Sequence, residues 1–135
     1  MRVDALVTLT LRLDGRRITD IASFYDEVNR VFMTGESWTL GPSLDALDDL
    51  LYGGYGALLG ADGVRVEWTD HDASLRALGR DATIAYHAAK LENPVYDAEL
   101  AGTAIAELEA GRGRTYGEIV LDVFAGHPEI ELILV

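Results

Sequence analysis

Three aspartates and one tyrosine recur at helical spacing between residues 45 and 52. Asp45, Asp48, Asp49 and Tyr52 stand at positions i, i+3, i+4 and i+7, so a helix over this segment would carry all four on one face. Carboxylates accept short, charge-assisted hydrogen bonds from arginine side chains. The pattern indicates a surface that binds a basic protein, although an acidic face that contacts only water would show the same spacing.

The other residue types that could do chemistry show no spacing typical of an active site. Cysteine is absent, which excludes thiolate ligands and cysteine nucleophiles, and no serine stands in a nucleophile elbow. Asp45 and Asp49 could together hold Mg²⁺, but no third ligand is near them. We therefore expect no catalytic residue, metal or cofactor. The histidines lack metal-ligand spacing and are expected at the surface or at helix ends: His71, His87 and His127.

The acidic segment is predicted to be an amphipathic helix over residues 44–52. Leu44, Leu47 and Leu51 share a second face at helical spacing, which favours burial of that face in a core. Ser43 is a suitable N-cap, and the glycines that begin at Gly53 are typical of a helix end.

The flanking sequence predicts a mixed α/β domain. Alternating apolar residues indicate strands over 6–13 and 64–69, and a nearly continuous apolar run indicates a buried strand over 130–135. Strands separated by helices favour a small parallel sheet. Further helices are expected over 20–33, 71–78, 81–91, 98–110 and 116–124.

Composition limits the partners that this chain can have. Its length of 135 residues is typical of a single domain. The chain has 23 acidic and 11 basic residues, for a net charge of −12. Half of this charge lies in residues 41–75, which contain seven acidic residues and one arginine. Such a field repels nucleic acid and anionic lipid and attracts cationic proteins. With no signal peptide or membrane span expected, the sequence indicates a cytoplasmic protein.

Four stretches resemble the barstar family of intracellular ribonuclease inhibitors. Residues 41–51 read GPSLDALDDLL and are followed by Gly53-Gly54, which is the most specific of the four. Residues 13–18, 66–68 and 119–135 are similar to the family's first strand and turn, its second strand, and its last helix and strand. The resemblance implies a three-layer α/β/α domain with a three-stranded parallel sheet. It also implies a protein that is not an enzyme but plugs the active site of a small basic secreted ribonuclease that prefers guanyl substrates.

The resemblance assigns the contact residues position by position. Asp45 and Asp49 match the family's helix acids, with Asp49 at the main plug, and Gly53 matches the glycine after the helix. The expected partner-binding set is completed by Asp122 on the last helix and by residues that depart from the family pattern. The departures are Asp48 in place of an aromatic residue, Tyr52 in place of a small polar one, and Trp38 and Thr39 in the preceding loop.

Residues 79–114 have no clear counterpart in short family members, so a helical insertion within a single domain over 1–135 is expected. Two other functions stay open on the sequence. An acidic immunity module could bind a different basic toxin, and a small hydrolase could use a metal held by Asp45 and Asp49.

Overall fold

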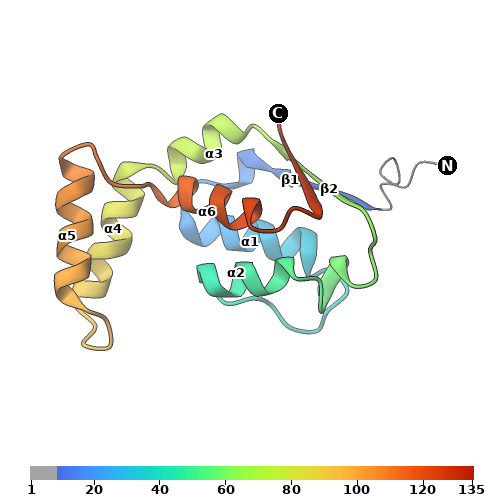
Figure 1. Cartoon of the computed structure of the whole chain (residues 1–135), viewed down its shortest axis with the longest axis horizontal. Helices are drawn as coiled ribbons and strands as arrows, with labels where there is room; N and C mark the ends of the chain where they lie inside the picture. The colour runs from blue at the N-terminus through green and yellow to red at the C-terminus, as the bar shows by residue number, and fades with distance from the viewer. Residues whose placement is uncertain (1–8) are drawn as a thin grey trace.

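The computed structural model describes residues 9–135, which contain a three-stranded sheet and six α-helices (Figure 1). All of the helices predicted from periodicity are present, and the part of the first predicted strand before residue 9 lies outside the described residues. The elements in chain order are β1 (Leu9–Asp14), α1 (Ile21–Phe32), α2 (Leu44–Leu51), β2 (Val64–Thr69), α3 (His71–Ala77), α4 (Arg80–Leu91), α5 (Ala98–Glu109), α6 (Tyr116–Ala125) and β3 (Ile130–Leu134).

The sheet is parallel throughout, with strand order β1-β2-β3. Leu13 pairs with Trp68 in register, and Trp68 pairs with Leu134. Helices connect each strand to the next, as parallel pairing requires. The α/β class and the three-stranded parallel sheet expected from the sequence are therefore confirmed.

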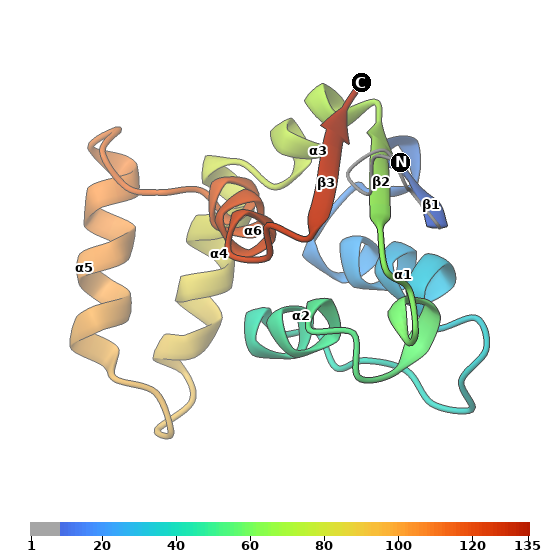
Figure 2. The ribbon, with the colours of Figure 1, turned by 45° about the vertical axis from the view of Figure 1, so that its right-hand side comes forward.

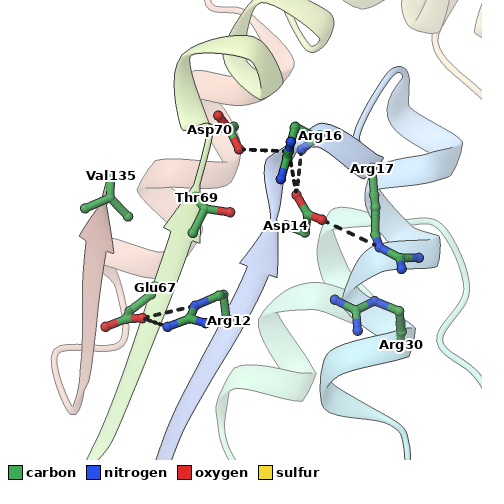
Figure 3. Close-up of a pocket in the computed structure, with 9 residues that line it drawn as sticks. All are labelled: Arg12, Asp14, Arg16, Arg17, Arg30, Glu67, Thr69, Asp70 and Val135. Atoms are coloured by element: carbon green, nitrogen blue, oxygen red, sulfur yellow. Dashed lines mark hydrogen bonds and ion pairs between the residues drawn. The ribbon is translucent and has the colours of Figure 1, made fainter.

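The layering differs from the expected three layers. Val64, Val66 and Trp68 alternate along β2 and are all buried against the apolar faces of α1, α2 and α6. The residues between them point to the opposite face, where Arg65 pairs with Glu131 at 2.6 Å and Glu67 pairs with Arg12 at 2.9 Å. Figure 3 shows the Arg12–Glu67 pair on this face and, beyond the end of β1, the pairs of Arg16 with Asp70 and of Arg17 with Asp14.

Within residues 9–135 the helices thus cover one face of the sheet, and the domain has two layers. The sequence carries the reason, because charged residues alternate with apolar ones along β2, and only one side of such a strand favours burial.

Helices α4 and α5 form a hairpin that projects from the rest of the domain (Figure 2). We call residues 80–109 the arm. Its attachment is at α6, where the Tyr116 backbone N–H donates to Thr83 Oγ1 at 2.8 Å and the Tyr86 ring packs edge-on against Tyr116. The arm coincides with most of the segment interpreted as an insertion. No helix within residues 9–135 has the length and apolar character needed to cross a membrane.

Candidate protein-binding site

The acidic helix α2 packs its leucine face into the core and directs its acidic face to solvent. Leu47, Leu50 and Leu51 are buried, whereas Asp45 and Asp49 are exposed, as the spacing predicts. The Ser43 side chain caps the helix by accepting from the Ala46 N–H at 3.1 Å. Both carboxylates therefore project from a short helix whose orientation is set by a cap at one end and by three buried leucines along its length.

A tight turn follows the helix. Gly53 adopts a φ of +83°, a left-handed conformation that glycine reaches without strain, and it is only partly exposed. Gly56 also has a positive φ, and a Cβ there would lie 2.6 Å from the Phe32 carbonyl oxygen. The turn therefore brings the chain back against the end of α1.

The loop before α2 is held at two points. The Asn29 side chain bonds both backbone groups of Leu40, accepting from its N–H at 2.7 Å and donating to its carbonyl at 3.3 Å. Glu36 accepts from the Gly56 N–H at 2.8 Å, which ties the loop to the turn after α2. Trp38 and Thr39 lie between these anchors and are both exposed.

An aromatic pair connects this loop to the acidic helix. The Trp38 ring lies 4.9 Å from the Tyr55 ring, measured between centroids. The pKa of Tyr55 is raised, first by burial and second by the Asp49 carboxylate nearby. Trp38, Tyr55 and Asp49 therefore form one continuous surface. The sequence indicated only a helix end at Tyr55, because nothing in its spacing connects it with Trp38.

Asp48 has a different environment from the other two aspartates. Its Oδ1 lies 2.7 Å from Nε2 of His127, at the end of α6, and its side chain is 46% exposed. His127 is at a helix end as expected, but it is buried. Its Nδ1 faces Glu129 at 3.5 Å, and its ring packs edge-on against the exposed Tyr52. The sequence could not show this pair, because its members are 79 residues apart.

Asp122 lies on α6, which packs against α2. Its carboxylate is exposed and forms an ion pair with Arg114, in the segment before that helix. Five of the eight predicted contact residues thus lie on α2 or directly after it, and Trp38 reaches this surface through Tyr55. Asp48 and Asp122 have partners within the chain.

The described residues hold no group of three side chains suited to bind a metal ion. In this part of the chain, nothing supplies a third ligand to Asp45 and Asp49. What the arrangement offers is a rigid acidic surface with an aromatic border, which suits binding of a basic protein.

One comparison with known proteins identifies the family. The family model described as "Barstar (barnase inhibitor)" matches residues 8–93, which is more than half of the chain. The matched range includes α2, the loop before it and the turn after it, whereas Asp122 lies outside. No curated protein matches the sequence. Because the match covers most of the domain, the chain belongs to the barstar family, whose members are inhibitors of ribonucleases and not enzymes.

Proposed function

We propose that this protein inhibits a small basic ribonuclease by inserting the exposed side of α2 into the cleft that binds RNA. The observation that carries the proposal is the position of Asp45 and Asp49, two solvent-facing carboxylates one turn apart on a capped and packed helix. Family membership supports a ribonuclease partner, and the net charge of −12 supports a basic one.

The mechanism follows from the chemistry of the two anions. A ribonuclease cleft binds phosphates with arginine and lysine, and a carboxylate accepts the same two-pronged hydrogen bonds from arginine. Asp45 and Asp49 would occupy phosphate positions but contain no phosphodiester bond to cleave. Because α2 is already ordered, binding does not have to order it, so more of the interaction energy remains as affinity.

The residues around α2 complete the proposed contact surface. Trp38, Thr39 and Tyr52 are exposed beside the two carboxylates, and Gly53 lets the chain turn away beneath them. Tyr55 is part of the proposed contact surface because its ring packs against that of Trp38. Asp48 takes a positioning role, since its bond to His127 joins α2 to α6. Asp122 would have to exchange Arg114 for a residue of the enzyme.

One observation supports the alternative partner, a basic toxin that is not a ribonuclease. Tyr52 is 72% exposed where the family resemblance implies a small polar residue, so the partner must accommodate a larger side chain. For either partner, we propose that the inhibitor acts in the cytoplasm as an immunity protein.

The test is inhibition of RNA cleavage by barnase and by a panel of other small basic, guanyl-preferring ribonucleases. The expected result is stoichiometric inhibition of at least one enzyme, which the Asp45→Asn/Asp49→Asn variant loses. Asp72→Asn/Asp81→Asn is the matched control, because it also removes two exposed carboxylates, but from α3 and α4. Failure to inhibit any ribonuclease of the panel would overturn the proposal. Equal losses in the test variant and the control would show that net charge, not α2, is responsible.

A further inference from the structure

The arm packs mainly on itself and leaves most of its surface in solvent. Among its thirty residues only Thr83, Ala101 and Leu108 are buried. The second half of the arm lies beyond the part of the chain that the family model matches. Burial in the core therefore does not explain why the chain carries this helical hairpin, and a role in binding is the alternative.

The turn between α4 and α5 concentrates exposed apolar side chains, and we call residues 91–100 the arm tip. Val95 is 84% exposed and Leu100 is 69% exposed, with Leu91 and Tyr96 close to half exposed. Apolar side chains gathered on the surface of a protein mark contact sites for other proteins. Beside them lies a shallow pocket of about 170 Å³, lined by His87, Lys90, Tyr96, Asp97, Leu100 and Ala101.

The arm tip is ordered by its own contacts. The Lys90 ammonium lies 4.3 Å from the centroid of the Tyr86 ring and 5.3 Å from that of Tyr96, so it holds the Tyr96 ring in place. The Asp97 carboxylate caps α5 by accepting from the Glu99 and Leu100 N–H groups. An aromatic side chain held in this way binds a partner without a large loss of conformational freedom.

The arm tip and the acidic helix lie on the same side of the molecule. In Figures 1 and 2 the α4–α5 turn and α2 both lie toward the bottom of the view. The exposed side of α2 points away from α1 and α6, which lie above it. A protein docked on α2 would therefore come within reach of the arm tip.

The charge of the arm tip indicates which kind of protein binds there. The arm tip contains Glu92, Asp97 and Glu99, all exposed, and no basic residue, whereas Lys90 directly precedes it. The arm tip is negatively charged, like the exposed side of α2, so both surfaces favour the same basic partner. A second copy of this chain would instead bring acidic surfaces together.

We propose that the arm tip is a second contact site for the ribonuclease bound by α2, with its apolar side chains selecting among enzymes whose active-site clefts are alike. This inference rests on the proposed function. The α2 carboxylates recognise what such enzymes share, which is a phosphate-binding cleft. The arm tip contacts the enzyme surface beside that cleft, which differs from one enzyme to the next.

The test uses the full chain and the ribonuclease that it inhibits most tightly, with barnase as the first probe. The Val95→Ser/Leu100→Ser variant is compared with Val135→Ser, which replaces an exposed apolar residue at the C-terminus, at the top of Figure 1, whereas the α4–α5 turn is at the bottom. We expect the arm variant to raise the Kd at least about tenfold, mostly through faster dissociation, because burial of a leucine-sized side chain contributes about that factor. Unchanged thermal unfolding confirms that the variants fold.

Amide hydrogen exchange gives a second readout that needs no substitution. Added ribonuclease should slow exchange in residues 91–101 as well as in α2. An unchanged Kd together with unchanged exchange in the arm tip, while Asp49→Ala still weakens binding, would overturn the inference and leave the proposed function standing. Sedimentation of the free protein tests whether a second copy of the chain binds the arm tip instead. A wild-type dimer that the Val95→Ser/Leu100→Ser variant dissociates would assign this surface to self-association and overturn the inference.

Discussion

Asp49 and Asp45 project from the same helix one turn apart, but their surroundings differ. Asp49 lies beside Tyr55, which is partly buried and packed on Trp38, whereas Asp45 is in the first turn of α2. A partner that covers Trp38 would also exclude water from Asp49. We therefore predict that Asp49→Ala weakens inhibition more than Asp45→Ala does.

The expected loss for Asp49→Ala is about 3–5 kcal/mol, since the variant leaves a buried cation of the enzyme without its partner. Titration calorimetry with the inhibited ribonuclease measures both variants. A larger loss at Asp45 than at Asp49 would contradict the order proposed for the two carboxylates.

His127 is the residue whose role sequence spacing did not reveal, and its burial predicts an effect on stability. Replacing it with alanine removes its bond to Asp48 and its contact with Tyr52 and leaves a cavity between α2 and α6. We expect His127→Ala to lower the free energy of unfolding by about 2–4 kcal/mol. Asp48→Asn keeps an oxygen acceptor for the ring and should cost less than about 1 kcal/mol. Urea denaturation compares the two, and an unchanged midpoint for His127→Ala would argue against this role.

At the scale of elements, a buried pair of phenols joins α1 to α6. The Tyr25 and Tyr116 hydroxyls lie 2.6 Å apart, so one donates to the other. Burial raises the pKa of Tyr116 to about 12 and raises the pKa of Tyr25 further. Both groups therefore keep their protons at a pH where an unfolded chain has lost them.

This pair predicts a loss of stability in alkali. Because both folded-state pKa values lie above the unfolded value near 10, the contribution is fully present below pH 10 and falls as the pH rises above it. We expect the free energy of unfolding to drop by about 2–3 kcal/mol between pH 9 and pH 11. In the Tyr25→Phe/Tyr116→Phe variant, urea titrations should show a much flatter dependence. An equal slope in both proteins would refute the assignment.

The sequence predicted the elements well because each has a local cause. Ser43, the Leu44–Leu47–Leu51 spacing and Gly53 mark both ends and the buried face of α2 without reference to any other segment. The outward position of Asp45 and Asp49 follows from the same spacing. The family resemblance implies three layers, but charged residues alternate with apolar ones along β2 and favour burial of only one face of the sheet.

The remaining differences depend on tertiary contacts. The His127–Asp48 pair joins the end of α6 to α2, and the Trp38–Tyr55 pair joins two loops that α2 separates. The ion pair of Asp122 with Arg114 involves a residue in the segment before α6. Whether such side chains meet depends on how the helices pack, and helical spacing carries no information about that.

For the whole molecule, the net charge of −12 and its concentration in residues 41–75 lead to a kinetic prediction. Charges far from a contact act on the rate of encounter through water and are screened by salt within about 10 Å at 0.1 M. Charges that contact the enzyme are covered in the complex and act on dissociation. We expect the association rate to fall at least about tenfold between 25 mM and 500 mM salt, with little change in dissociation.

Variants separate the two contributions of charge. Asp72→Asn/Asp81→Asn removes two exposed charges outside α2, and it should lower the association rate slightly and leave dissociation unchanged. Asp49→Ala should mainly speed dissociation. Stopped-flow mixing with the inhibited ribonuclease measures both rates. If instead salt sped dissociation of the wild-type complex as much as it slowed association, the carboxylates would remain in water in the complex. Insertion of α2 into the cleft would then be wrong, because a carboxylate seated among arginines in a closed cleft is shielded from added ions.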